Sequence, residues 1–337
     1  MHIIAKLYPL LSVSRLFNVE CRWLFVLIRK DTYPMASPRL KAHLALSAAC
    51  LFWAGNMVVA RMLAEYLGGW HVVAGRCLVS ALLFFLLLRM VEPGQRLQWR
   101  PLGVGLFLAI TGVVGYQGLL YFGVRATSVI NTSLIHATAP IVTLVMAALY
   151  LGSPIQRGQP VAALLSLAGI VVIVTKGSWE VLSTFSLASG DWLIMLATVS
   201  FAAYSVVGRK VLGSRSVIEV TTLITIWAAL IALPLAGWES QATPAQWNWQ
   251  AVAGMVYIII FPGVLAMLAW NYAVKVVGPA ESMLYMNTVP VIAVVMSVVW
   301  LDESLLISQV VGGALVLAGC YGSVLLTRPV ASAGAKA

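Results

Sequence analysis

Residues 121–174, YFGVRATSVINTSLIHATAPIVTLVMAALYLGSPIQRGQPVAALLSLAGIVVIV, have a second, related copy in this chain. Shifted by 150 positions, the stretch falls on residues 271–324 without a gap. The matched positions outside the common apolar types are Arg125 with Lys275, Pro140 with Pro290, and Gln159 with Gln309. Apolar segments share Leu, Val and Ala by chance, but matched proline, glutamine and cationic positions are harder to obtain in that way. The chain therefore contains two copies of one unit, and we expect its function to lie where they meet.

The composition is that of a membrane protein. Of the 337 residues, 61% are hydrophobic and only 9% are charged, which is too little charge to cover the surface of a soluble domain of this length. Apolar runs of about 20 residues, the length of a helix that crosses a ~30 Å hydrocarbon layer, recur throughout. Because backbone groups in lipid have no water to bond with, these continuous runs predict helices. The expected fold class is an all-α membrane protein.

We expect ten transmembrane helices, arranged as two five-helix repeats. The expected spans are residues 43–64, 70–90, 101–123, 127–151, 158–175, 190–212, 218–238, 250–273, 279–301 and 304–326. They divide the chain into a basic N-terminal extension and tail (1–42), a first repeat (43–175), a linker (176–189), a second repeat (190–326) and a C-terminal tail (327–337). Cationic residues interrupt every apolar run in residues 1–34. We interpret that segment as an upstream extension with Met35 as the physiological start; a basic interfacial helix is the alternative.

The distribution of Lys and Arg predicts the orientation. With the N-terminus in the cytoplasm, twelve Lys and Arg residues beyond residue 35 lie in cytoplasmic segments, and three (Arg61, Arg125 and Lys176) lie outside. Cytoplasmic loops carry the excess of positive charge, so both termini are expected on the cytoplasmic side of the inner (plasma) membrane. The net charge of +10 is then mostly a topology signal, and no nucleic-acid partner is expected.

The odd number of spans in each repeat inverts the second copy relative to the first. The two halves are then related by a pseudo-two-fold axis that lies in the membrane plane. Inverted repeats of this kind are typical of alternating-access transporters, which bind their solute near the midplane between the halves. We therefore expect a small-molecule substrate between the repeats and the lipid bilayer around them.

A first candidate site consists of two matched helix faces. Asn56 lies roughly 18 Å into its span at about 1.5 Å per residue, close to the middle of the membrane, and Trp53 shares its helix face. At a shift of 148 positions, the matching face carries Phe201 and Tyr204. The two faces form either a clamp for a ligand or a helix–helix contact held by an asparagine hydrogen bond.

Further polar groups lie deep in the spans, where they are costly and usually face a cavity or a partner. Tyr116 and Gln117 lie between two glycines, which permit a bend or close packing. His136 can titrate near neutral pH and carry a proton, although a neutral core histidine is the commoner case. The expected substrate contacts are Trp53, Asn56, Tyr116, Gln117, His136, Tyr204 and Asn287.

The few charged residues of the spans are expected to be structural. For Arg76 the expected partners are Glu65 or backbone carbonyls of neighbouring spans, and substrate binding is the alternative. Glu281 lies near the start of its span, at the interface with the headgroups. Glu303 lies at the start of the last span, where a carboxylate suits the helix dipole.

No motif in the sequence supports catalysis or metal binding. The sequence has no phosphate-binding loop followed by Lys, no metal-binding His pair and no nucleophile elbow. Four cysteines, Cys21, Cys50, Cys77 and Cys320, are scattered singly, without the spacing of metal ligands. We expect no enzyme activity, no cofactor, no metal and no disulfide.

The motifs of the spans resemble those of the drug/metabolite transporter (DMT) superfamily, specifically its ten-span type with two EamA domains. The matching features are FWAGNMVVAR at residues 52–61, Arg76, and VVGPAESMLYMNTVPVIAVVMSVVWLDESLLISQVVGGALVLAGC at residues 276–320. The resemblance covers residues 43–326. It departs from the family pattern at Ser153, where the family often has Glu. The polar, aromatic spans look most like those of amino-acid exporters of the YddG type.

This resemblance implies a secondary transporter that exports amino acids, aromatic or neutral ones, or related small metabolites by alternating access. Its driving force is either the substrate gradient or a coupled proton. Efflux of cationic drugs is the alternative, and the lack of an acidic residue deep in the spans counts against it. A membrane enzyme or a scaffold is less expected. The small-residue face at Gly312, Gly313 and Gly319 joins either two spans or two protomers.

Overall fold

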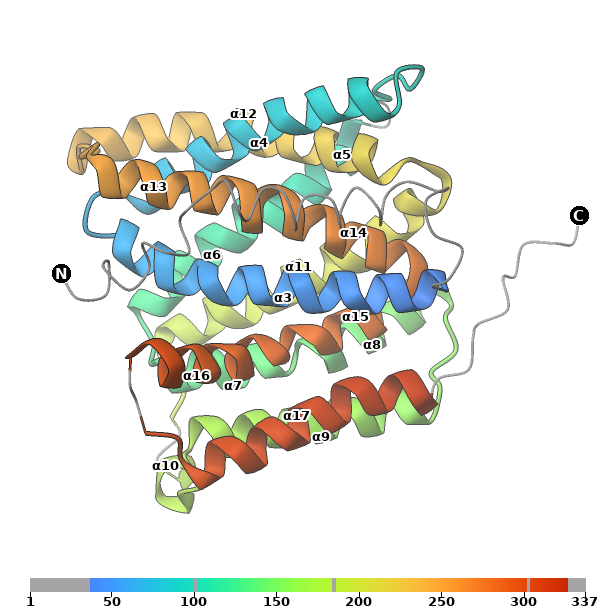
Figure 1. Cartoon of the computed structure of the whole chain (residues 1–337), viewed down its shortest axis with the longest axis vertical. Coiled ribbons are helices and arrows are strands. Elements are labelled where there is room, and N and C mark those ends of the chain that lie inside the picture. Colours follow the sequence, from blue (N-terminus) through green and yellow to red (C-terminus); the bar gives the residue numbers. More distant parts are fainter. Residues whose placement is uncertain (1–36, 100–101, 184–185, 302–303, 327–337) are drawn as a thin grey trace, which may run out of the picture.

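The computed structural model describes residues 37–99, 102–183, 186–301 and 304–326, which form helices joined by short loops (Figure 1). The helices are α3 (Pro38–Leu63), α4 (Gly69–Val91), α5 (Leu102–Ala109), η1 (Ile110–Val114), α6 (Gly115–Arg125), α7 (Val129–Ala137), α8 (Ala139–Leu151), α9 (Gly158–Val174), α10 (Trp179–Ser183), α11 (Ser189–Ser214), α12 (Val217–Ala242), α13 (Trp249–Ile258), η2 (Ile259–Leu265), α14 (Ala266–Val277), α15 (Pro279–Met286), α16 (Thr288–Leu301) and α17 (Ile307–Leu326). The predicted extension (1–34), Glu303 and the C-terminal tail (327–337) lie outside the described residues.

Every predicted span coincides with one helix or with consecutive helices. Within the described residues, seven helical stretches are long and apolar enough to cross a membrane, and Gly158–Val174 and Ile307–Ser323 are shorter apolar helices. The remaining predicted span, 279–301, is divided between α15 and α16. The predicted all-α membrane architecture is therefore confirmed, and the observed helix ends differ from the predicted ones by only a few residues.

Side-chain caps set where several helices begin. The hydroxyl of Ser37 accepts a hydrogen bond from the backbone N–H of Leu40 at 3.2 Å, and Pro38 follows at the first helical position, where no N–H is needed. Ser128 caps α7 and Asn248 caps α13 in the same way. These oxygens satisfy N–H groups that the first helical turn leaves open. The starts of these spans are thus determined by local sequence.

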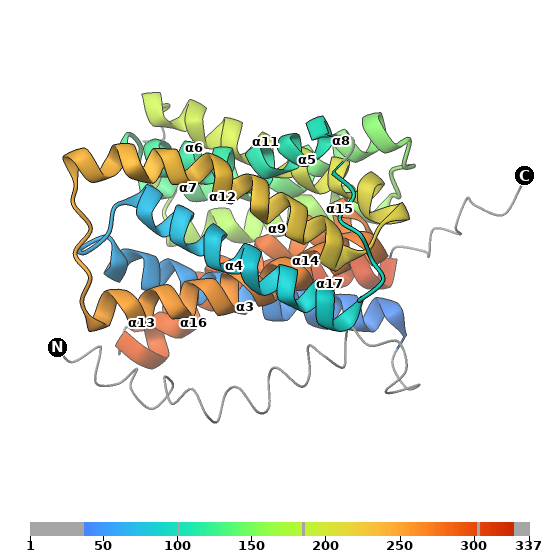
Figure 2. The ribbon, with the colours of Figure 1, turned by 90° about the horizontal axis from the view of Figure 1, so that it is seen from above.

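The helices pair across an approximate two-fold axis. α9 packs against α17 and α4 against α12, and each of these two pairs joins a helix to its counterpart in the other repeat. α8 packs against α15, so the second half of the fourth span contacts the first half of the ninth. α3 packs on α14 as α11 packs on α6, which is the same contact with the repeats exchanged. In Figure 1 the α4–α12 pair lies at the top and the α9–α17 pair at the bottom, with α3, α11 and α14 between them. Figure 2 views the same bundle from above, where α4 and α12 lie side by side.

Backbone irregularities occur at matching places in the two repeats. The third span passes through a π-helical stretch at Ile110–Val114, and the eighth through another at Ile259–Leu265. The fourth span breaks at Thr138 and the ninth at Asn287. Pro262 lies inside the second π-helical stretch and has no N–H for the usual helical bond. Irregular backbone at membrane depth is tolerated where it is enclosed by protein or borders a cavity, so these places indicate where a site lies.

α9 and α17 touch through their backbones. A Cβ added at Gly312 would lie 2.6 Å from the carbonyl oxygen of Gly169, and one added at Gly319 would lie 2.6 Å from the carbonyl oxygen of Ala162. Small residues allow this approach in membranes, where packing rather than water drives helix association. Gly312 and Gly319 therefore join two spans of one protomer.

Gly312→Ala is expected to lower the free energy of unfolding by about 1–3 kcal/mol, because the added methyl group must push α9 and α17 apart. Gly322→Ala in the same helix is the control, since a Cβ there meets no atom within 4 Å. Unfolding of the purified protein in SDS measures both variants. Equal stability of the two would contradict the backbone contact.

Candidate functional site

A cavity of about 270 Å³ lies between the two repeats. The first repeat lines it with α3, α4, η1 and α6, and the second with α11, α12, η2, α14, α15 and α16. Gly112 of η1 and Pro262 of η2 both lie on its wall, so the cavity adjoins the π-helical stretches of both repeats. It reaches Ala60 near the C-terminal end of α3. The irregular backbone and the cavity thus coincide.

One wall of the cavity is aromatic. The ring centroid of Phe201 in α11 lies 5.0 Å from that of Tyr116 in α6 and 6.4 Å from that of Trp53 in α3. Trp270 of α14 is fully buried behind them, at 5.3 Å from Trp53 and 5.4 Å from Phe201. Aromatic pairs in such tilted and edge-on arrangements are favourable. The wall therefore presents a preformed apolar surface to a small solute.

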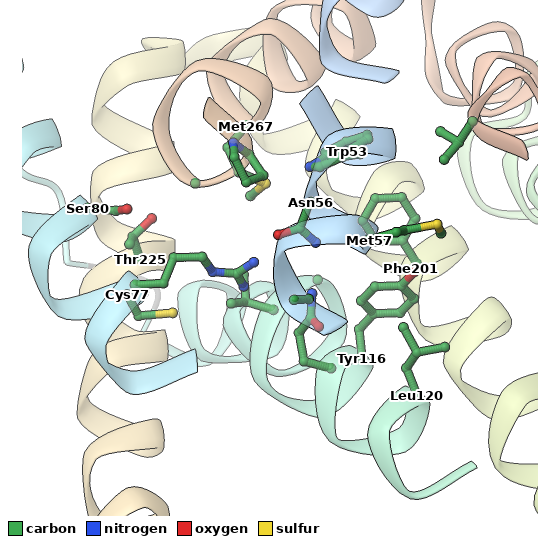
Figure 3. A pocket seen from close by; sticks show the side chains of 18 of the residues that line it. Trp53, Asn56, Met57, Cys77, Ser80, Tyr116, Leu120, Phe201, Thr225 and Met267 are labelled. Carbon is green, nitrogen blue, oxygen red and sulfur yellow. The ribbon is translucent and has the colours of Figure 1, made fainter. Parts of the chain in front are cut away.

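The opposite wall is polar. In Figure 3, Ser80 and Thr225 lie on one side of the cavity and Phe201 on the other, with Asn56 between them. Arg76 of α4 also lines the cavity, and within the described ranges it has no carboxylate at ion-pair distance. No Asp or Glu is among the described residues of the lining. The cavity lining is therefore amphipathic, and the cation Arg76 carries the formal charge of its described residues.

Four of the seven predicted substrate contacts line this cavity. They are Trp53, Asn56, Tyr116 and Gln117. The structure brings them together from two helices, α3 and α6, that are far apart in sequence. The other three predicted contacts, His136, Tyr204 and Asn287, lie behind the wall and are absent from the described lining.

Tyr204 is held in the core of α11. It is 1% exposed, and its hydroxyl donates a hydrogen bond to Oδ1 of Asn271 at 2.7 Å. Asn271 in turn donates to Oγ1 of Thr221 at 2.9 Å, so the chain of bonds links α11, α14 and α12. The Tyr204 ring packs so closely on Gly112 that a Cβ there would overlap it. Of the two matched polar residues, Asn56 faces the cavity and Tyr204 faces the helix packing.

His136 and Asn287 lie one layer behind the cavity. The ring of His136 meets that of Tyr116 edge-on, with centroids 6.0 Å apart. Asn287 is 4% exposed and donates hydrogen bonds to Oγ of Ser166 at 2.9 Å and to the carbonyl oxygen of Ala137 at 3.3 Å. Asn287 therefore ties the ninth span to the fourth and fifth, and His136 reaches a solute only through Tyr116.

The three charges predicted to be structural have different surroundings. Glu281 pairs with Arg39 at 3.1 Å. Arg76 lines the cavity, and within the described chain it forms no ion pair with Glu65. Glu303 lies outside the described residues. In that described part, no three His, Cys, Asp or Glu side chains gather as a metal-ligand set.

Several lining residues were missed by sequence reasoning because their side chains are small. Ser80 and Cys77 of α4 and Thr225 of α12 all lie on the cavity wall. Cys77 and Thr225 are 148 positions apart, the shift that also pairs Trp53 with Phe201. The repeat itself was therefore the signal that pointed to this second pair of facing helices.

A polar cluster ties α3 to α15 at the end of the bundle where α3 begins. Glu281 contacts Arg39 at 3.1 Å and Nε2 of His43 at 3.3 Å. Nδ1 of His43 and the Tyr285 hydroxyl are hydrogen-bonded at 3.0 Å, and the buried Cys50 thiol donates to the Tyr285 carbonyl oxygen at 3.1 Å. We call Arg39, His43, Glu281 and Tyr285 the α3–α15 latch.

This latch has a counterpart between α11 and α7, where the repeats are exchanged. Asp191 of α11 accepts hydrogen bonds from Asn131 of α7 at 2.8 Å and from the hydroxyl of Thr127. Asp191 is 148 positions from His43, and Asn131 is 150 positions from Glu281. The equivalent pair of helices, with the repeats exchanged, is thus tied in each case, by an ionic contact between α3 and α15 and by amide and hydroxyl hydrogen bonds to Asp191 of α11.

This arrangement matches a known family. The sequence profile of the EamA-like transporter family matches residues 40–175 and 188–325, one match for each repeat. The chain belongs to the EamA-like transporter family. The resemblance to the DMT superfamily that the motifs indicated is thereby confirmed. Membership of the EamA-like family makes the chain a multi-pass membrane transporter of a small molecule.

Relatives with the EamA-like fold cover most of the chain. YyaM of Bacillus subtilis, an uncharacterised transporter, is 26% identical over 285 residues, which are 83% of this chain and 92% of YyaM. A probable terminal-alkyne amino-acid exporter of Streptantibioticus cattleyicolor is 28% identical over 213 residues, 62% of this chain and 68% of that protein. A crystal structure with 18% identity superposes with a TM-score of 0.69 and covers 86% of this chain and 99% of its own, which shows the shared fold.

Glu281→Gln is expected to loosen the α3–α15 latch of this EamA-like transporter, because Arg39 loses its carboxylate. Arg39 is partly exposed although Glu281 is buried, and an ion pair open to solvent on one side is worth about 1 kcal/mol, which corresponds to a roughly fivefold larger open population. Labelling of Cys50 by N-ethylmaleimide, followed by mass spectrometry of its peptide, should therefore become roughly fivefold faster. Glu180→Gln in the exposed α10 is the control. An unchanged rate at Cys50 would show that another contact keeps this end closed.

Proposed function

We propose that this chain exports amino acids, neutral or aromatic ones, or related small metabolites by alternating access across the plasma membrane. The observation that carries the proposal is the cavity between the repeats, where an aromatic wall of Trp53, Tyr116 and Phe201 faces a polar wall. An amino acid has the matching chemistry, with an apolar side chain at one end and charged groups at the other. The relative described as a probable amino-acid exporter supports the same class of solute.

The inverted repeats supply the mechanism of the proposal. Because the two halves have the same fold in opposite orientations, exchanging their conformations moves access from one membrane face to the other. The irregular stretches η1 and η2 border the cavity. A bend there changes access to the solute without unfolding a span, since such kinks already have their hydrogen bonds arranged locally.

In the proposed orientation, with both termini in the cytoplasm, the cavity extends toward the outer face, and the latches at both ends are formed. The cavity reaches Ala60 near the outer end of α3, whereas the α3–α15 latch lies at the cytoplasmic end. Export then requires the latch to open, so that a cytoplasmic solute can enter. The solute gradient is the proposed driving force, because no acidic proton carrier is among the described lining residues. A proton carried by His136 is the alternative.

Counterflow in proteoliposomes tests the class of solute. Vesicles loaded with unlabelled phenylalanine or leucine are expected to accumulate the labelled amino acid, whereas vesicles loaded with tetraphenylphosphonium should not accumulate that cation. A cationic drug would need a buried counter-charge, and the described wall offers Arg76 instead. Exchange of the cation without exchange of any amino acid would overturn the proposal in favour of drug efflux. A pH gradient imposed across the same vesicles separates proton coupling from simple exchange.

Two substitutions separate the cavity from the packing behind it. Asn56→Leu is expected to slow counterflow roughly tenfold, as the loss of a polar contact of about 1.4 kcal/mol predicts, while unfolding is unchanged. Tyr204→Phe is expected to lower the unfolding free energy by about 1–3 kcal/mol, because the buried Asn271 oxygen loses its donor. Its KM should stay within about twofold of the unmodified protein. Equal effects of the two variants on KM would place Tyr204 at the solute.

A further inference from the structure

A cation without a counter-charge lies on the wall of the cavity. Arg76 is partly buried in α4, and within the described ranges neither Asp nor Glu lies at ion-pair distance from it. The neighbouring side chains on the wall include the neutral thiol of Cys77. Charged side chains inside a membrane are rare, and they usually find a partner or face a water-filled path. Within the described residues, Arg76 therefore faces the cavity without a carboxylate of the protein beside it.

A second polar group next to Arg76 also lacks a partner. Ser80 is 1% exposed, lines the cavity, and its Oγ has no hydrogen-bond partner within the described protein. Buried hydroxyl groups are almost always bonded, because an unmade hydrogen bond in a low-dielectric site is costly. Ser80 is one helical turn from Arg76, and residues four apart lie on the same helix face.

Gly263 of η2 brings these two side chains to one place. A Cβ added at Gly263 would lie 2.9 Å from Oγ of Ser80 and 3.2 Å from Cγ of Arg76. Both side chains therefore cross the backbone of the π-helical stretch at a position where only glycine fits. Arg76 and Ser80 thus pass the same glycine and both line the cavity, and a guanidinium and a hydroxyl group that face one cavity are donors for a carboxylate, the guanidinium through charge-assisted hydrogen bonds.

We propose that Arg76 and Ser80 bind the carboxylate of the transported solute and that the aromatic wall of Trp53, Tyr116 and Phe201 receives its side chain. This inference rests on the proposed function and narrows it to carboxylate-bearing solutes. Within the described lining no acid faces the solute's amine, so the amine contributes less to recognition than the carboxylate does. Acids that lack a free amine are then also ligands.

The cation also gives the solute one orientation. At a shift of 148 positions the counterpart of Arg76 is Ile224, a buried apolar residue of α12. The two repeats therefore do not offer equivalent ends to a carboxylate. A solute binds with its carboxylate toward α4 and η2 and its side chain toward α3, α6 and α11.

Binding of matched acids and amides tests the inference. The probes are phenylalanine, phenylalaninamide, N-acetylphenylalanine and N-acetylphenylalaninamide, with the corresponding leucine compounds, and tryptophan fluorescence of the purified protein reports binding. Each acid is expected to bind roughly tenfold to hundredfold more tightly than its amide, the range of a charge-assisted hydrogen bond. N-acetylation should change affinity by less than that. Amides that bind as well as their acids, or failure of every acid to bind, would overturn the inference.

Variants assign the preference to the two residues. Arg76→Gln is expected to abolish the acid–amide preference, Arg76→Lys to retain part of it, and Ser80→Ala to reduce it several-fold. Arg125→Gln is the matched control, because Arg125 lies at the exposed end of α6 beside Tyr121, and it should keep the full preference. A preference that survives in Arg76→Gln would place the carboxylate elsewhere.

Thermal unfolding separates this role from a structural one. Without ligand, Arg76→Gln should raise the unfolding temperature, because it removes a charge that has no partner. A structural arginine would give the opposite sign. The counterflow assay is independent of this result: acids that bind through Arg76 without amino-acid exchange would leave the carboxylate site standing and overturn the proposed export. Exchange of amino acids together with equal binding of acids and amides would support the proposed export and overturn the carboxylate site.

Discussion

A polypeptide in lipid has no water to bond with, so each span must satisfy its own backbone hydrogen bonds. Any irregular stretch must be enclosed by protein or border a cavity. In the part of the chain that the structure describes, the π-helical stretches η1 and η2 both border one cavity. The break at Asn287 falls in sequence between Met286 and Val289, which also line that cavity. The α4–α12 and α9–α17 pairs lie on opposite sides of the bundle (Figure 1), and α4 and α12 contribute to the cavity wall. The cavity therefore lies where irregular backbone stretches of the two repeats come together.

The fold could be predicted from the sequence because its determinants are local or repeated. The length of the apolar runs predicts the spans. Matched residues such as Pro140 and Pro290 predict the repeat, and the odd number of spans in each repeat predicts its inversion. Depth in the membrane was also accessible, since it follows from counting residues along a helix. The direction in which a side chain points was not. The repeat matches Asn56 with Tyr204, but the side-chain direction turns by about 100° with each residue of a helix, so a match in sequence does not give that direction. In the structure, Tyr204 packs on Gly112 and points away from the cavity.

Charge was the second limit of sequence reasoning. Arg76 was expected to have a structural partner because charges in a membrane are usually paired. Whether Glu65 reaches it depends on how α4 rotates against its neighbours, and a linear sequence does not contain that rotation. The small neighbours Ser80 and Cys77 carry no signal of depth or charge and become visible only once α4 and α12 face each other. The polar wall is thus a tertiary property, whereas the aromatic wall follows in part from the repeat.

The counterpart latches show that the two repeats have diverged at their ends as well as at the cavity. One end is tied by a carboxylate and a guanidinium, and the other by a carboxylate that accepts from an amide and a hydroxyl. Coulombic contacts between partly exposed groups weaken with ionic strength, whereas short hydrogen bonds to neutral donors respond far less. Under the proposed alternating access, the two access states of the empty protein are therefore unequal in free energy, and the difference depends on the salt that bathes one face. Under the same proposal, the empty protein favours one access state over the other, although its two halves share one fold.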